Sequence, residues 1–252
     1  MTKFSIPKEP QSLFSTLGTG FELCKSLYFR VLPLTLVLAS LNTLFLSATW
    51  KQQPFPNAMP SGNPVPVAGV DLPTLITALA VGLLIFYIVM GLHAAVVYLT
   101  NSIAIKKEST LMMALYYGFG KGIPLLGVSI LYMLFVWIGT ILLIIPGIYI
   151  GVLLSLSLFL IVIKDWGVWD AFKDSRRLVT GNWWKTAAFC FGFAIILGLI
   201  PCLIMFSLQN NLPLAYLLHF LFLGLFYPLY YSCFMALVYD LERRKGINPV
   251  SQ

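Results

Sequence analysis

The residues of this chain best suited to bind a charged ligand are a few cations beside tryptophans. Most of them fall within one stretch, DAFKDSRRLVTGNWWKTAAF, which covers Asp170–Phe189. A guanidinium group can hold a phosphate through two parallel hydrogen bonds, an ammonium group binds it as a point charge, and indole rings favour the headgroup depth of a bilayer. This pattern predicts contact with anionic lipid headgroups. The candidate residues are Lys121, Arg176, Arg177, Trp183, Trp184 and Lys185.

The candidate cations differ in how closely carboxylates neighbour them in the sequence. Asp170 and Asp174 are one helical turn from cations, and they are close enough to neutralise Arg177, so Arg176 is the stronger candidate of the two arginines. Lys121 lies in the segment YYGFGKGIP, for which two interpretations remain. The lysine contacts a lipid phosphate, or the glycines form a hinge between two helices. The hinge is the favoured interpretation.

Residues that could perform catalysis are sparse. No nucleophile elbow, zinc-protease motif or phosphate-binding loop is present. The two histidines, His93 and His219, fall in different apolar segments at different depths, so we assign them packing roles rather than a proton relay. Asn42 is interpreted as an interhelical hydrogen-bonding residue, and the four separated cysteines as packing residues. We therefore predict no enzyme activity, no cofactor and no metal.

Composition defines the elements that position these residues. The chain has 252 residues, of which 59% are hydrophobic and 10% charged, whereas soluble domains carry about a quarter charged residues. We predict an all-α integral membrane protein that forms a single membrane domain over residues 1–252, with a proline-rich external loop over 51–71. Six spans are predicted. They are Leu27–Trp50, Leu72–Ile105, two within 123–163 that turn at Pro146-Gly147, Thr186–Phe206 and Leu212–Tyr239.

The basic residues predict the orientation of these spans. Of the 16 lysines and arginines, the topology places all but Lys51 on one side, so the N- and C-termini are predicted to be cytoplasmic. The high positive charge follows from this asymmetry and does not indicate binding to nucleic acid. All carboxylates lie outside the predicted spans, which argues against ion or proton coupling.

A threefold repeat is visible in the order of these features. Units over about 11–105, 108–163 and 166–240 each begin with a short amphipathic segment and continue into two spans, which predicts three interfacial helices and three transmembrane hairpins. In the third unit the apolar face is predicted to hold Trp169, Phe172, Val179 and Trp183, interrupted by Arg176. The charged face holds Asp170, Lys173, Asp174 and Arg177. Gly181 is predicted to end this helix, Asn182 to cap the next, and Lys185 to extend outward from span five.

One set of residues resembles a known family. Pro146-Gly147-Ile148, Asp165, Ala171, Ser175, Leu178, Gly181 and Trp183 form a pattern similar to that of YciC-like bacterial inner-membrane proteins, which also occurs in the membrane domain of some glycerophosphodiester phosphodiesterases. The resemblance implies a multi-pass protein of the bacterial inner membrane with a link to the envelope or its lipids, and it implies no catalytic residues.

Two functions follow as expectations. The first is a non-enzymatic membrane protein of envelope or lipid organisation, whose interfacial helices engage anionic lipids or a cytoplasmic partner. The alternative is a transporter or flippase-like protein for a small or lipidic substrate, and a membrane-embedded enzyme is the third choice. The sequence names no protein partner.

Overall fold

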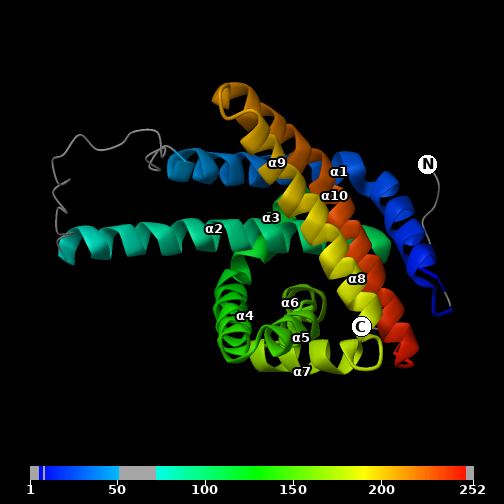
Figure 1. The fold of residues 1–252 in the computed structure, drawn as a ribbon. Helices are drawn as coiled ribbons and strands as arrows, with labels where there is room; N and C mark the ends of the chain where they lie inside the picture. Colours follow the sequence, from blue (N-terminus) through cyan, green and yellow to red (C-terminus); the bar gives the residue numbers. More distant parts are fainter. Residues whose placement is uncertain (1–5, 8, 51–71, 248–252) are drawn as a thin grey trace, which may run out of the picture.

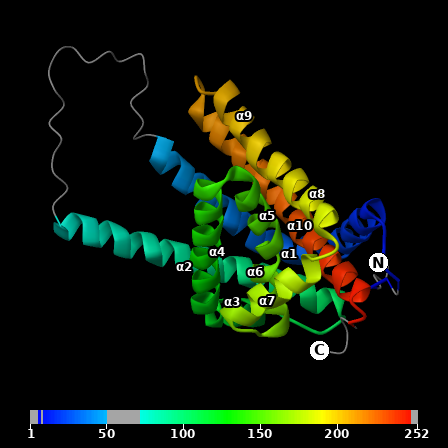
Figure 2. The same cartoon turned by 60° about the horizontal axis from the view of Figure 1, so that its bottom comes forward.

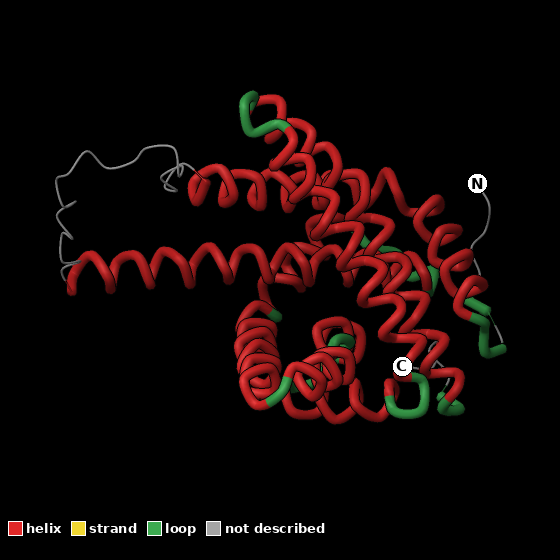
Figure 3. Tube along the Cα trace, viewed as in Figure 1, coloured by secondary structure: helices red, strands yellow, loops and turns green. Residues whose placement is uncertain are grey.

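The structure is a computed structural model that describes residues 6–7, 9–50 and 72–247. The described residues form helices joined by short loops and contain no strand (Figure 3). Six helical segments are long and apolar enough to cross a membrane, which is compatible with a polytopic membrane protein. They are Leu13–Ala48, Leu75–Ala104, Gly122–Leu142, Ile144–Lys164, Trp183–Ser207 and Leu212–Arg244. The predicted external loop over 51–71 lies outside the described residues.

The first and last helices form the most extensive contact of the structure. Helix α1 (Leu13–Trp50) runs antiparallel to α10 (Leu212–Arg244) along most of its length (Figure 1). Gly20 makes this approach possible, because a Cβ atom there would lie 2.6 Å from the Cα of Cys233. The predicted first interfacial helix is therefore not a separate element. It is the first part of α1, which is bent and contains Pro33.

Helix α2 (Leu72–Ala104) packs against α3 (Leu111–Gly120), which is the second predicted interfacial helix. The two backbones meet at glycines, since a Cβ atom on Gly118 would lie 2.4 Å from the carbonyl oxygen of Gly91. Tyr87 of α2 also donates a hydrogen bond to the carbonyl oxygen of Phe119 at 2.8 Å. Gly118 thus permits close helix packing. The helix ends at Gly120 and the next one begins at Gly122, so the chain breaks at Lys121, where the hinge is predicted. The hinge itself stays a prediction.

The turn within the long uncharged run differs from its prediction. Helix α4 (Gly122–Leu142) ends at Leu143, which is extended, and α5 (Ile144–Leu154) begins directly after it. Pro146 and Gly147 lie inside the first turns of α5, where proline is tolerated because the first amides of a helix have no partner. Gly147 has an ordinary helical φ and instead allows α4 and α5 to touch, because a Cβ there would lie 2.7 Å from the amide nitrogen of Thr140.

The remaining two apolar segments are interrupted helices. Helix α5 is followed by a break at Ser155 and then by α6 (Ser157–Lys164). After α7 (Val168–Val179), the next segment consists of α8 (Trp183–Ala194), the π-helical turn η1 (Ile195–Leu199) and α9 (Ile200–Ser207). Pro201 lies in the first turn of α9, and because it lacks an amide hydrogen it accounts for one hydrogen bond missing from the ladder beside η1.

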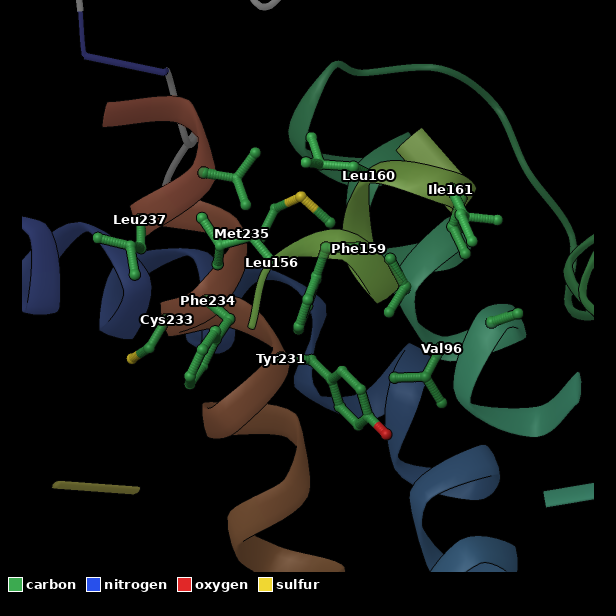
Figure 4. Packing of buried hydrophobic residues seen from close by; sticks show 14 of the residues in the cluster. Val96, Leu156, Phe159, Leu160, Ile161, Tyr231, Cys233, Phe234, Met235 and Leu237 are labelled. Atoms are coloured by element: carbon green, nitrogen blue, oxygen red, sulfur yellow. The ribbon is translucent and has the colours of Figure 1, made fainter. Parts of the chain in front are cut away.

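Burial is concentrated in the second half of α10. Every residue from Tyr231 to Glu242 is buried, so α10 is enclosed on all sides there, whereas a surface helix buries only one stripe. Phe234 stacks on Phe159 of α6 with ring centroids 5.5 Å apart, and Val96 of α2 lies on the other side of Tyr231 (Figure 4). This region is the core that fixes α6, α8 and α10 relative to one another.

Two ends of the molecule can be distinguished in Figure 2. The start of α1, the end of α10, α3 and α7 lie toward the bottom of that view, and we call this region the terminal end. The α4–α5 and α9–α10 connections lie toward the top, and the first half of α2 projects away from the other helices in both views. We call Leu72–Ile85 the distal half of α2. Nearly all of its side chains that the structure describes are exposed.

Candidate functional site

Helix α7 is held at the terminal end by its buried face. Ala171, Ser175 and Leu178 recur at helical spacing and are fully buried, and the hydroxyl of Ser175 donates to the carbonyl oxygen of Leu153 at 2.7 Å. The helix ends at Thr180, followed by Gly181 at φ +87°, which confirms the predicted end. Asn182 begins α8 as predicted, but its side chain does not cap that helix.

The faces of α7 differ from their prediction at two residues. Phe172 and Val179 are buried as expected, whereas Trp169 is 60% exposed and Asp174, predicted on the charged face, is buried. The reason is electrostatic, because two cations reach Asp174 and offset the desolvation cost of burying its charge. The stripe that contacts the core is therefore rotated away from Trp169, and that indole faces outward with the cations.

Several outward residues of α7 and of the start of α8 are cations or tryptophans, and we call this group the basic-aromatic face. Arg176 is exposed, and its side chain has no hydrogen-bond or ion-pair partner among the described residues. Lys173 is exposed and lies 3.6 Å from Asp170, a weak surface pair. Trp184 is 82% exposed. The face consists of Trp169, Lys173, Arg176, Arg177 and Trp184.

Trp183 does not belong to this face. Its ring stacks on Tyr149 of α5 with centroids 5.7 Å apart, and its indole nitrogen donates to the carbonyl oxygen of Tyr149 at 3.5 Å. The two neighbouring tryptophans are nearly perpendicular to each other. Trp183 therefore docks α8 on α5 and is only partly exposed, whereas Trp184 is the more exposed of the two predicted headgroup tryptophans.

A buried ion network lies directly behind the basic-aromatic face. The ammonium group of Lys164, at the end of α6, lies 2.8 Å from a carboxylate oxygen of Asp174 and 2.8 Å from one of Glu242, and all three side chains are at most 2% exposed. Arg177 completes the network at 2.8 Å from the other oxygen of Asp174, as its predicted neutralisation requires. Two cations thus balance two carboxylates and connect α6, α7 and α10.

Lys185 belongs to a second buried network. Its ammonium group donates to Asp240 and to the hydroxyl of Thr16, each at 2.7 Å, and to the carbonyl oxygen of Gln11 at 2.9 Å. Asp240 also accepts from the amide of Gln11 at 2.5 Å and from Arg244 at 2.8 Å. The three hydrogens of Lys185 are therefore used inside the protein. The predicted outward extension of this lysine is wrong, because Asp240 lies within its reach.

Lys121 is also engaged by the protein. It forms an ion pair with Asp165, the residue that ends α6 in a left-handed conformation at φ 57°. This contact with Lys121 lowers the pKa of Asp165 below its ordinary value. Tyr117 donates to the carbonyl oxygen of Val162 at 3.1 Å, and burial, followed by the nearby Asp165 carboxylate, raises the pKa of its phenol. Lys121 therefore joins α3 to the end of α6.

The two networks bear on the prediction that all carboxylates lie outside the spans, because the last apolar segment, Leu212–Arg244, contains Asp240 and Glu242. Asp174, Asp240 and Glu242 are all buried, two of them in the last turns of α10. Sequence reasoning missed them because their partners are remote in sequence, as with Gln11 and Asp240. One signal was present: acidic residues directly follow the apolar run of α10, and Lys164 directly follows the uncharged run of α4 to α6.

The histidines occupy separate positions, as predicted. His219 is buried, and its Nδ1 lies 3.0 Å from the hydroxyl of Thr43 across the α1–α10 contact. His93 of α2 contacts the hydroxyl of Tyr231 of α10 through Nδ1. Asn42, predicted to make an interhelical hydrogen bond, is exposed and has no hydrogen-bond partner among the described residues. No group of metal-ligating side chains occurs in the described part of the chain.

The residues that resemble the YciC-like pattern have separate structural roles. Ser175 attaches α7 and Gly181 follows its end, whereas Gly147 lies against α4 and Trp183 docks α8 on α5. Comparison of the chain with protein-family models, curated proteins and solved structures finds no match.

Proposed function

We propose that this chain is a non-enzymatic, multi-pass protein of the bacterial inner membrane that organises envelope lipids by binding anionic headgroups. The observation that carries the proposal is the basic-aromatic face. It presents Arg176, which has no partner among the described residues, together with the exposed tryptophans Trp169 and Trp184, which lie on either side of it in the sequence. Cations and indole rings in this arrangement suit the headgroup layer, where each basic residue near an anionic surface contributes about 1 kcal/mol.

The buried networks support a recognition surface at this position. A helix lying in the headgroup layer needs an internal attachment if it is to hold its cations in one geometry. Asp174 supplies that attachment, because it fixes Arg177 from inside the protein while Arg176 points outward. The basic face is therefore held by charge pairs as well as by apolar packing.

The same proposal includes a topology. The terminal end would be cytoplasmic, with three hairpins each preceded by an interfacial segment and both termini on the cytoplasmic side. The charge asymmetry of the sequence and the resemblance to YciC-like proteins support this orientation. Reporter fusions after Lys245 and within residues 51–71 would test it, with a cytoplasmic signal expected only from the first.

The test of the function compares two matched charge removals. In Lys173→Gln/Arg176→Gln, two cations leave the basic-aromatic face, and both buried networks stay intact. In the control, Lys106→Gln/Lys107→Gln, two exposed cations leave the same end of the molecule outside that face. Native mass spectrometry of purified protein reports the ratio of anionic to zwitterionic lipid that each variant retains.

The two variants distinguish specific binding of anionic headgroups at the basic-aromatic face from general attraction of anionic lipid to positive charge. We expect the face variant to retain several-fold less anionic lipid than wild type, with the control close to wild type. Equal losses would show that only total charge matters, and no loss in either variant would show that the face is an anchor. Either result would overturn the proposal. Lys185 is excluded from the test because its removal would disturb Asp240.

A second candidate function is movement of a lipidic substrate through the bundle. It is favoured by one observation: two apolar segments are interrupted, at Ser155 and at η1. Transporters use discontinuous helices near their substrate sites. Proteoliposomes loaded with fluorescent lipid and treated with a membrane-impermeant quencher test it. Transport predicts protein-dependent access of the quencher to inner-leaflet label, and its absence would remove this candidate.

A further inference from the structure

A cavity within the apolar part of the helices has the composition of a ligand site. It has a volume of about 350 Å³ and lies between α1, α2 and α10. Its wall is mostly apolar, with Leu38 and Phe45 from α1 and Val89 from α2. Three polar side chains also line it: Asn42, His93 and Tyr227. A concave apolar site of this size with a few convergent polar groups is the usual form of a small-molecule site.

Two of the three polar side chains of this cavity have no hydrogen-bond partner among the described residues. Asn42 and the hydroxyl of Tyr227 make no hydrogen bond to any described residue. His93 uses Nδ1 for Tyr231, which leaves Nε2 directed elsewhere in the ring plane, and Tyr227 lies edge-on to the same ring at 6.4 Å. In hydrocarbon an unpaired polar group is costly, so an occupant that pairs these groups is favoured.

The chemistry of the wall limits the occupant. No charged side chain among the described residues lines the cavity, so a carboxylate or phosphate inside it would have no counter-charge from this part of the chain. The polar set combines donors and acceptors, because an amide provides both and a phenol provides both. The site therefore suits uncharged oxygen, such as a hydroxyl, beside a hydrocarbon chain.

The opening indicates that the ligand enters from the membrane. Phe45 and Ile85 line the cavity and are 65% and 44% exposed, so apolar side chains form its rim. Gly82 also lines it, and a Cβ atom there would meet nothing within 4 Å. The gap between α1 and α2 thus faces the bilayer interior, to which a lipid has direct access and water does not.

We propose that this cavity binds an uncharged, single-chain lipid alcohol, whose hydroxyl is held by Asn42, His93 and Tyr227 and whose chain lies along α2. The site is separate from the basic-aromatic face, and it requires neither headgroup binding nor transport. Its occupant would also explain why α1 and α2 are separated beside Gly82, since a lipid chain would fill the space between them.

Photolabelling in proteoliposomes tests the proposal with a defined probe. The probe is a hexadecanol analogue carrying a diazirine, and the matched probe is the corresponding fatty acid, which differs in bearing a charge. We expect the alcohol to label peptides that contain Leu38–Phe45 or Gly82–His93, and the acid to label them at least fivefold less. Equal labelling by the two probes would overturn the assignment of an uncharged ligand.

Variants locate the site. Gly82→Trp places a large ring in the cavity without altering its polar groups, and we expect labelling to fall about tenfold. The matched control is Leu79→Trp, which adds an indole to the exposed part of the same helix and should label like wild type.

Asn42→Leu removes one hydrogen-bonding group and should weaken competition by unlabelled hexadecanol roughly threefold to tenfold. Unchanged labelling in Gly82→Trp, with an unchanged melting temperature confirming its fold, would refute the site.

Discussion

The second half of α10 and the distal half of α2 are both apolar helix, and they illustrate two opposite uses of it. Tyr231–Glu242 is buried on every side, and its carboxylates Asp240 and Glu242 bind cations from α6, from α8 and from the end of α10 itself. Leu72–Ile85 is exposed almost throughout and contacts little of the described chain. Hydropathy alone does not separate the two, because a helix surrounded by protein and a helix surrounded by lipid are both uniformly apolar. The difference lies in the polar residues at the ends of the helices.

The largest effect should come from removing the central cation of the terminal end. Lys164→Met leaves Asp174 and Glu242 buried with a missing partner, so we expect a loss of about 3–5 kcal/mol in stability. Thermal unfolding of the purified protein measures it. Lys107→Met removes an exposed cation at the same end and should cost less than about 0.5 kcal/mol. The double variant Lys164→Met/Glu242→Gln should recover part of the loss, and a further loss there would contradict the assignment of the ion pair.

Truncation of leucine side chains should show the same difference between α10 and the distal half of α2 without changing any charge. Leu237→Ala creates a cavity at a fully buried position of α10 and should destabilise the protein by about 2–5 kcal/mol. Leu79→Ala in the distal half of α2 leaves no cavity in the protein, so its effect should stay within about 0.5 kcal/mol. The same thermal measurement applies to both variants. Comparable losses at the two positions would show that the distal half has a protein partner in the membrane.

The α1–α10 contact should depend on the size of a single residue. In Gly20→Ala the new methyl group would lie 2.6 Å from the Cα of Cys233, and the overpacking should cost about 1–3 kcal/mol. Gly18→Ala adds the same group to the same helix where nothing lies within 4 Å, and it should be neutral or stabilising by up to about 1 kcal/mol. If Gly20→Ala and Gly18→Ala have the same melting temperature, α1 and α10 are less closely packed than described.

The smallest effect concerns the exposed ion pair of Lys121 and Asp165. Contact with Lys121 lowers the pKa of Asp165 in the folded protein. The stability that the Asp165 carboxylate contributes is therefore fully present above the ordinary carboxyl pKa of about 3.9, and it is lost as the pH falls through the lowered pKa of the folded protein. Because the pair is exposed, the difference between wild type and Asp165→Asn should be about 0.2–1 kcal/mol at pH 7. Melting temperatures of the two proteins should converge in acid. If the difference in melting temperature stayed constant down to pH 3, the Lys121–Asp165 pair would be excluded as the source of that difference.

Several parts of this molecule could be predicted from the sequence because their causes are local. The apolar runs located the six segments to within a few residues, although α1 begins well before Leu27 and α10 continues beyond Tyr239. Gly181 ended α7 as predicted, since few residues other than glycine adopt φ +87° without strain. The turn near Pro146 was displaced to Leu143 because nothing polar marks it within a long apolar run.

The site was less predictable because it depends on contacts between distant residues. Lys185 and Asp174 have the sequence context of surface residues, and each is buried by a partner on another element, Asp240 and Lys164 respectively. A hydropathy pattern reports how often a residue type is exposed, but it carries no information on which opposite charge lies within reach. The pairing of Arg177 could be predicted because Asp174 lies within one helical turn of it, and Arg176, which has no such neighbour, stays the candidate for a headgroup contact.

The pairing of α1 with α10 has a consequence for how the protein is made. Chains are synthesised from the N-terminus, so α1 enters the membrane long before its main partner leaves the ribosome. Until then Gly20 and Thr35 face lipid or the insertion machinery, and the amide of Gln11 lacks its hydrogen-bond acceptor, Asp240. The pairing of α1 is therefore completed only after α10 has been translated. A chain that stops before α10 would leave α1 unpaired and would be exposed to membrane proteases.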